Sequence, residues 1–284
     1  MYTQSITRRH RTAFLLAIDG SGSMAEEIRF RGRTSTKAEA VAAIANELLF
    51  ELIERARRSD GVRDYYDIAL IGYSGDDEVY PLLPGGREMV SVTELAGIAP
   101  TLRRTAVECR LPTAHCLREV TVPTWIEPHA VGQTPMCEAL RRIRDLAAAW
   151  CADPAHAESF PPVVFHITDG EATDCDDEEL RTVAGQIRDL GTTDGKVLLI
   201  NIHIAADAEG RSVFFPSEEE SAYPNRYAAL LCDCSSVMPE VFEAAIREAK
   251  GPGALPPFRG VSYNASADQL VAMLNIGSIS VKTE

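Results

Sequence analysis

The sequence predicts a doubly wound α/β fold, with a mostly parallel central sheet flanked by helices and two long accessory insertions. Two observations predict this fold. Short, nearly continuous apolar runs recur along the chain, as in strands that are buried on both faces of a parallel sheet. Between them lie longer segments that carry apolar residues at helical spacing. Strands that alternate with helices in this way are typical of an open α/β sheet.

The predicted elements follow from these two patterns. The apolar runs expected to be strands are Ala13–Ile18, Ile68–Tyr73, Val163–Ile167 and Val197–Ile204. The segments expected to be helices are Thr36–Arg57, Met136–Trp150, Glu178–Leu190, Glu240–Lys250 and Ala267–Leu274. The spacing of Thr36 and Glu39 predicts a capping box at the start of the first helix.

We expect all 284 residues to form a single domain. Its core covers about residues 11–204 and is completed by a closing helix at about 267–274. Two segments fit the alternation poorly, because they are rich in Pro, Gly and polar residues. These segments, at about 82–130 and 205–261, are interpreted as accessory elaborations on the same domain, and the sequence does not define their role.

The charge and hydropathy of the chain exclude several classes of partner. The formal net charge of −14 makes attraction to phosphate backbones or anionic lipid unfavourable, so we expect no nucleic-acid and no membrane partner. No apolar run approaches the roughly 20 residues of a membrane span. The apolar run near the N-terminus is too short for a secretory signal and ends in Asp19. We therefore expect a cytoplasmic protein.

The seven cysteines do not resemble a disulfide framework, because their number is odd and the chain is long. We expect reduced, partly buried thiols. A zinc site is the alternative, either around Cys109, His115 and Cys116 or at the pair Cys232 and Cys234. The spacings match no common zinc module, which favours the reduced thiols.

The first candidate functional residues follow the first apolar run. Asp19 ends that run, and a parallel strand delivers its last residue to the carboxyl edge of the sheet, where open α/β folds place their ligands. Ser21 and Ser23 present hydroxyl groups from the loop that follows. Carboxylate and hydroxyl oxygens suit a hard cation such as Mg²⁺. The alternative for this stretch is an ordinary turn of Asp, Ser and Gly.

Two further residues extend this pattern. Thr134 precedes Pro135 at the start of a predicted helix, and its alternative role is that of a helix cap. Asp169 follows the run Val163–Ile167 and so reaches the same sheet edge as Asp19; its alternative role is that of a turn residue. The three features together, each at the end of its element, predict a magnesium site.

The residues Asp19-Gly20-Ser21-Gly22-Ser23, Thr134 and Asp169 resemble the metal-ion-dependent adhesion site (MIDAS) of von Willebrand factor A (VWA) domains. The resemblance covers roughly Arg11 to Ile204 and the closing helix. It implies a Rossmann-like fold and a bound Mg²⁺, for which Mn²⁺ or Ca²⁺ are possible substitutes. It also implies that both serines and the threonine are metal ligands, and that Asp169 binds directly or through water. Thr168–Asp174 resembles cytosolic bacterial members, including those associated with tellurite-resistance proteins or chaperone-like ATPases.

The function that this resemblance implies is magnesium-dependent protein–protein interaction. A partner protein would offer a Glu or Asp side chain to the open coordination position of the ion, in a bacterial stress-response or other multiprotein assembly. Arg29, Arg31 and Arg33 follow the metal loop closely and are expected to steer that acid. The sequence specifies neither the partner nor the oligomeric state.

Two other functions use the same residues. A bound Mg²⁺ can polarise a phosphoryl oxygen or activate water, which would make the chain a phosphoryl-transfer enzyme or hydrolase with His166 or His203 as base. The sequence lacks a phosphate loop and an H-E-x-x-H motif, and His166 is expected to pack in the core, so we expect no enzyme. In the third function, a structural or regulatory subunit, the metal only stabilises loops. The acidic run Asp174–Glu179 is expected to start a helix rather than to form a second cation site.

Overall fold

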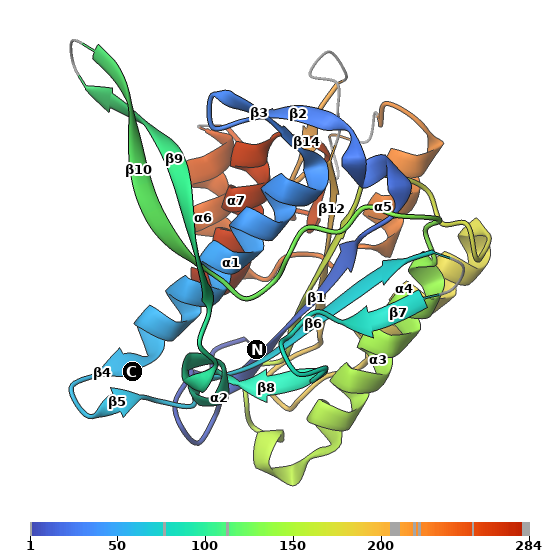
Figure 1. Ribbon diagram of the computed structural model, residues 1–284. Coiled ribbons are helices and arrows are strands. Elements are labelled where there is room, and N and C mark those ends of the chain that lie inside the picture. The colour runs from blue at the N-terminus through green and yellow to red at the C-terminus, as the bar shows by residue number, and fades with distance from the viewer. Residues whose placement is uncertain are drawn as a thin grey trace.

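The computed structural model describes residues 2–75, 78–111, 114–204, 211–217, 220, 223–251 and 253–279, without the side chains of residues 104–120. Within these residues, eight strands form one mostly parallel sheet that is covered by helices on both faces (Figure 1). This arrangement confirms the predicted α/β fold class. No helix among the described residues is both long and apolar enough to cross a membrane.

The central strand is the first predicted one, β1 (Thr12–Asp19). On one side it pairs in parallel with β6 (Tyr66–Ser74), and on the other with β11 (Val163–Thr168). Beyond β11 lie the parallel strands β12 (Leu198–Ile204) and β14 (Val261–Ala265). The chain leaves β1 toward β6 and later returns to β11 on the opposite side. The strand order therefore reverses between β1 and β11, which is where open α/β sheets bind ligands.

Short antiparallel strands extend both edges of the sheet. They are β7 (Glu78–Pro81) and β8 (Met89–Ser91), which pair with β6, and β13 (Val213–Phe214), which pairs with β14. Two small hairpins lie outside the sheet. Their strands are β2 (Glu27–Phe30) with β3 (Arg33–Thr36), and β4 (Arg57–Arg58) with β5 (Gly61–Val62).

Alternate residues of β1 supply two hydrophobic cores, because successive side chains of a strand point to opposite faces. Phe14, Leu16 and Ile18 belong to the core under one helical layer. That layer contains α1 (Lys37–Ala56), α2 (Val92–Gly97), α6 (Glu240–Lys250) and α7 (Ala267–Ile279). Leu15 and Ala17 belong to the core under the other layer. It contains α3 (Met136–Ala152), α4 (Asp177–Asp189) and α5 (Arg226–Cys234).

The four predicted strands and five predicted helices all occur close to their predicted positions. The predicted capping box at the start of α1 is also confirmed. The Thr36 hydroxyl accepts from the Glu39 amide at 3.1 Å, and the Glu39 carboxylate accepts from the Thr36 amide at 3.0 Å. This reciprocal pair fixes the point at which β3 ends and α1 begins.

The segment 82–130 contains β8, α2 and a long hairpin of β9 (Thr101–Leu111) and β10 (Ala114–Thr124), which extends away from the body (Figure 1). Buried Asn46 of α1 anchors the chain where it leaves this hairpin. Its Oδ1 accepts from the amides of Trp125 and Ile126, at 2.7 and 3.1 Å. The side chains of Cys109, His115 and Cys116 lie outside the described part of the structure, so the zinc alternative on this hairpin stays untested.

The segment 205–261 contributes more to the core than the sequence indicates. Helix α5 packs on the sheet through Tyr227, Leu230 and Leu231, and the segment leads directly into β14, a parallel strand of the sheet. The sequence reasoning missed β14 because its apolar residues alternate with Ser262 and Asn264 instead of forming a continuous run. This pattern fits a strand near the sheet edge, where only β13 covers its outer side.

Candidate metal site at the carboxyl edge of the sheet

Asp19 is the last residue of β1 and is buried, as predicted. Its Oδ1 accepts from the backbone amide of Ser21 at 2.8 Å. Its Oδ2 accepts from the hydroxyl of Thr168, the last residue of β11, at 2.9 Å. Both carboxylate oxygens thus accept hydrogen bonds, one from the loop after β1 and one from the end of β11, at the point where the strand order reverses.

The two serines connect Asp19 to Asp169. The hydroxyl oxygens of Ser21 and Ser23 are 3.2 Å apart, and the Ser23 hydroxyl donates to Asp169 Oδ1 at 2.6 Å. Ser21 is buried, whereas Ser23 is exposed at the surface. The oxygen atoms of four predicted ligands therefore converge from the loops that follow β1 and β11.

The loop that carries Thr134 is pinned to the loop after β1. The amide of Val131 donates to Gly20 O at 2.7 Å, and the amide of Gly22 donates to Gly132 O at 2.9 Å. Gly132 has a φ of +80°, and a Cβ on it would lie 2.4 Å from the Cα of Gly75. Only glycine fits this close approach of two backbones.

Thr134 itself is buried and is paired with the loop after β11. Its amide donates to the hydroxyl of Thr173, and its carbonyl accepts from the amide of Thr173, each at 3.0 Å. The structure therefore brings together the three loops that carry the five predicted ligands. Thr134 is not the cap of α3, which begins at Met136 with Pro135 in the cap position.

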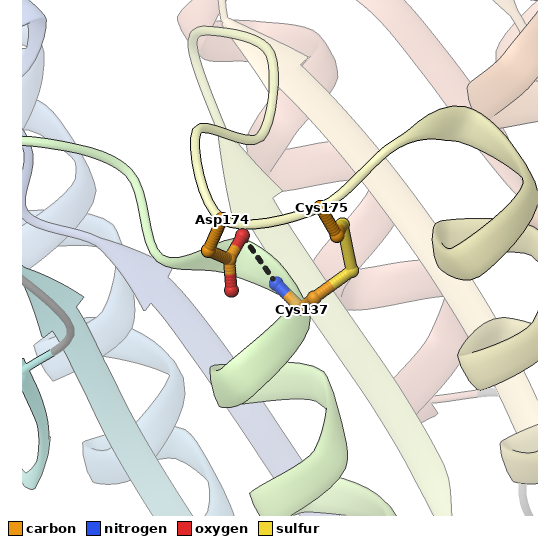
Figure 2. Close-up of side chains that lie close together, drawn as sticks. All are labelled: Cys137, Asp174 and Cys175. Carbon is orange, nitrogen blue, oxygen red and sulfur yellow. Dashed lines mark hydrogen bonds between the residues drawn. A yellow bond between two sulfur atoms is a disulfide. The ribbon is translucent and has the colours of Figure 1, made fainter.

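A disulfide between Cys137 and Cys175 joins the start of α3 covalently to the loop after β11 (Figure 2). Cys137 lies in the first turn of α3, and Cys175 lies between β11 and α4. This pair corrects the expectation of reduced thiols for these two residues, whereas Cys151, Cys232 and Cys234 are free, as expected. Spacing gave no sign of it, because the residues are 38 positions apart and meet only through the packing of α3 beside α4. Disulfides are rare in cytosolic proteins, so this pair does not favour the expected cytoplasmic location.

Asp174 lies beside the disulfide and caps α3. Its two oxygens accept from the amides of Cys137 and Glu138 at 3.1 and 2.9 Å, and Figure 2 shows the first of these bonds. Cys137, Asp174 and Cys175 lie close enough to hold a metal ion. Because the sulfurs bond to each other and the carboxylate caps the helix, these groups already have structural roles. The following acids begin α4, as predicted, with Asp176 as its cap.

The electrostatics of the site favour a cation. Burial is the largest cause that raises the pKa of Asp19, to about 6; the hydrogen bonds from Ser21 and Thr168 oppose this rise, and the negative charge of Asp169 contributes to it. A positive charge beside the two carboxylates would relieve both effects. An all-oxygen set of two carboxylates and three hydroxyls also fits Mg²⁺, which prefers oxygen ligands. The residues present therefore fit the predicted ion.

The sequence reasoning missed one cation that lies within the site. Lys37, the first residue of α1, has a side chain that is only 4% exposed. Its Nζ lies 2.9 Å from Asp169 Oδ2 and 2.7 Å from Glu26 Oε2. A lysine at the start of a helix usually faces water, and no local signal in the sequence distinguishes this one.

The three arginines expected to steer a partner lie on the hairpin of β2 and β3. Arg31 forms a bidentate pair with Glu47 of α1 and stacks over the ring of Phe30. The charge of Arg31 is therefore already compensated, which weakens its expected role in steering. Arg29 and Arg33 are exposed at the surface, and their role stays a prediction.

Neither candidate base presents a free ring nitrogen to the site. His166 is fully buried, as predicted, and its nitrogens lie 2.9 Å from Tyr73 Oη and 2.8 Å from Asn201 Oδ1. His203 accepts from the amide of Asn264 at 3.3 Å and also hydrogen-bonds the backbone of Asp169. Burial lowers the pKa of both imidazoles to about 4, so both rings are neutral at pH 7.

The fold and site define an α/β protein with an oxygen-lined candidate metal site at the point where its strand order reverses. No family model and no curated protein matches the chain. A von Willebrand factor type A protein from Catenulispora acidiphila is 16% identical over 70% of this chain and 34% of that chain, with a TM-score of 0.40.

Two further solved structures are similar at lower TM-scores. The three N-terminal domains of the type V pili tip protein Mfa5 from Porphyromonas gingivalis are 14% identical over 57% of this chain and 20% of that chain, with a TM-score of 0.31. An uncharacterized membrane-spanning protein from Vibrio fischeri is 16% identical over 70% of this chain and 93% of that chain, with a TM-score of 0.25. The chain thus spans about a third of the Catenulispora chain and a fifth of the three-domain Mfa5 chain. At these identities and TM-scores, the likenesses establish no family.

Proposed function

We propose that this chain is a VWA-type interaction module that binds Mg²⁺ and, through the ion, a carboxylate of a partner protein. Asp19, Ser21, Ser23 and Thr134 would hold the ion, and Asp169 would hold it directly or through water. The observation that carries the proposal is the convergence of their loops at one edge of the sheet. Ser23 contacts both Ser21 and Asp169 through its hydroxyl, although 146 positions separate it from Asp169.

The chemistry of the donor set supports a carboxylate as the incoming ligand. Two of the five proposed ligands are carboxylates, and one of them, Asp169, shares its charge with Lys37. A bound divalent ion would therefore keep positive character. Ser23 is exposed, so the ion would be reachable from outside on that side. A hard cation with an open position prefers another oxygen, and an anionic oxygen most strongly.

The enzymatic alternative has less support from the arrangement of the site. A general base must reach the proton it removes, at a heavy-atom distance of about 2.6–3.2 Å or through one water. The ring nitrogens of His166 and His203 are hydrogen-bonded to protein groups.

The structural alternative, in which the metal only stabilises loops, predicts metal binding without carboxylate binding. One experiment separates it from our proposal.

The experiment uses Mn²⁺ as a paramagnetic substitute for Mg²⁺ and glutarate as a carboxylate probe. Mn²⁺ binding to the full chain is measured by the relaxation enhancement of water protons, and glutarate is then titrated into the complex. We expect Mn²⁺ to bind, Mg²⁺ to displace it, and glutarate to lower the enhancement by replacing bound water. The diamide of glutaric acid should have no effect, because it is uncharged.

Two variants make this experiment specific. Asp19→Asn removes one ligand charge with little change of shape and is expected to abolish Mn²⁺ binding. Asp67→Asn is the matched control, since Asp67 is also a buried aspartate, but it lies at the opposite end of β6 and pairs with Arg11. It should leave Mn²⁺ binding unchanged. Equal binding by wild type and Asp19→Asn would refute the metal site, and binding of Mn²⁺ without any response to glutarate would favour the structural role.

A further inference from the structure

We infer that Lys37 is a built-in counter-cation of the metal site, which takes the place of the metal at Asp169 when no ion is bound and thereby weakens metal binding. This inference rests on the proposed function and deepens it. Its basis is the contact of the Lys37 ammonium with Asp169 Oδ2 at 2.9 Å, inside a site where the Asp169 side chain is fully buried.

The surroundings of Asp169 show why a counter-cation is needed. Its Oδ1 accepts from Ser23 and its Oδ2 accepts from Lys37, so both oxygens have partners within the protein. Asp19, a second buried carboxylate, accepts from the amide of Ser21, whose hydroxyl contacts the Ser23 hydroxyl that donates to Asp169. Without a cation, the mutual repulsion of two buried carboxylates and the loss of their hydration would destabilise the folded state. The positive charge of Lys37 reduces this destabilisation in the absence of a bound metal ion.

The Lys37 ammonium also has a second hydrogen-bond acceptor, which it can keep when it moves away from Asp169. Glu26 Oε2 lies 2.7 Å from Nζ, and the Glu26 side chain is 56% exposed. The backbone supports the same geometry, because the amide of Lys37 donates to Glu26 O at 3.0 Å. An ion that binds Asp169 must either share it with the ammonium or displace the ammonium toward Glu26. Both alternatives lower the affinity for the metal ion. In the first, the ion and the ammonium repel each other, and in the second, the charge-assisted hydrogen bond between Lys37 and Asp169 is weakened.

The test measures Mn²⁺ affinity and metal-free stability in the same variants. Lys37→Met removes the charge and keeps most of the side-chain volume. We expect it to bind Mn²⁺ about tenfold or more tightly than wild type, as the loss of a competing charge-assisted bond implies. In EDTA its Tm should fall by about 5 °C or more, because Asp169 is left buried without its partner. Lys37→Arg keeps the charge and should stay close to wild type in Mn²⁺ affinity.

Lys250→Met is the matched control. Lys250 is another largely buried lysine, whose Nζ bonds to Glu220 and to the carbonyls of Phe214 and Phe215, and it belongs to α6. Its substitution should lower the Tm without changing the Mn²⁺ affinity. Should Lys37→Met not fold in EDTA, Lys37→Gln provides the same two readings with a polar side chain.

The outcomes separate this inference from the proposed function. Unchanged or weaker Mn²⁺ binding by Lys37→Met and Lys37→Gln, with wild-type binding intact, overturns the role of Lys37 and leaves the proposed function standing. Binding by Lys37→Met but not by wild type supports the role of Lys37 and refutes magnesium dependence of the natural chain. Absence of binding in wild type and in both variants overturns the two together.

Discussion

The disulfide between Cys137 and Cys175 should contribute about 4 kcal/mol to the free energy of unfolding. The perturbation is its removal, either by reduction or in the double variant Cys137→Ala, Cys175→Ala. The magnitude follows from the 38 positions between the two cysteines. A cross-link limits the conformations of the unfolded chain, and the loop-closure relation gives about 4 kcal/mol for a loop of this size.

The native state should survive the removal, because the two loops keep other connections. Thr134 and Thr173 pair through two hydrogen bonds, and Asp174 caps α3 with two more. The loss of stability is therefore expected to arise mainly in the unfolded state. A protein of this size that loses about 4 kcal/mol can remain folded, since native domains are typically stable by about 5–15 kcal/mol.

The assay is equilibrium unfolding in urea of the oxidised wild type, the reduced wild type and the double variant, with peptide mapping to identify the bond. The reduced protein and the double variant should lose similar amounts. Cys151→Ala is the control, because Cys151 is a free, partly buried thiol of the same helix. Its stability should respond to reductant as the wild type does. Equal stability of the oxidised and reduced wild type, with the mapped bond present, would refute the reasoning.

Three further predictions concern other parts of the structure. Gly132→Ala should lower the free energy of unfolding by at least about 2 kcal/mol, because it forces a left-handed residue and a Cβ against the backbone of Gly75. Asn46→Ala should cost at least about 2 kcal/mol, since it leaves the buried amides of Trp125 and Ile126 without their acceptor. Burial lowers the pKa of His166 to about 4, below that of the unfolded chain, so its contribution is lost as the pH falls from about 6.5 toward 4. Between pH 7 and 5 this loss should be about 2 kcal/mol, and His166→Gln should remove it.

Urea unfolding measures all three, and each has a specific contrary result. An unchanged midpoint for Gly132→Ala would show that the loop can open at no cost. For Asn46→Ala, a loss below about 0.5 kcal/mol would mean that water replaces the acceptor. The pH series is run on His166→Gln and wild type together. The raised pKa of Asp19 increases the free energy of unfolding as the pH falls, opposite to the effect of His166, and this contribution is common to both proteins. Parallel pH profiles of the two proteins would exclude the assigned role of His166.

Local pattern predicted the sheet well where strands are buried on both faces. The apolar run of β1 and its final Asp19 define an element and its end, so the position of the carboxylate at the sheet edge followed directly. The same reasoning placed Asp169, because it too follows a buried parallel strand. It missed β14, whose polar residues interrupt the apolar pattern. It also missed Asn46, whose partner Trp125 lies 79 positions along the chain, just after the hairpin of β9 and β10.

The sequence by itself determined which residues could bind an ion, since oxygen-bearing side chains at strand ends and a Thr before a predicted helix are local features. Only the tertiary structure decided what lies among them. Lys37 meets Asp169 across 132 positions, and Cys137 meets Cys175 across 38. Neither contact has a local signature, because each arises from the packing of separate elements around the point where β1 and β11 lie side by side. The sequence thus indicates the candidate ligands, and the packing places the Lys37 charge and the disulfide among them.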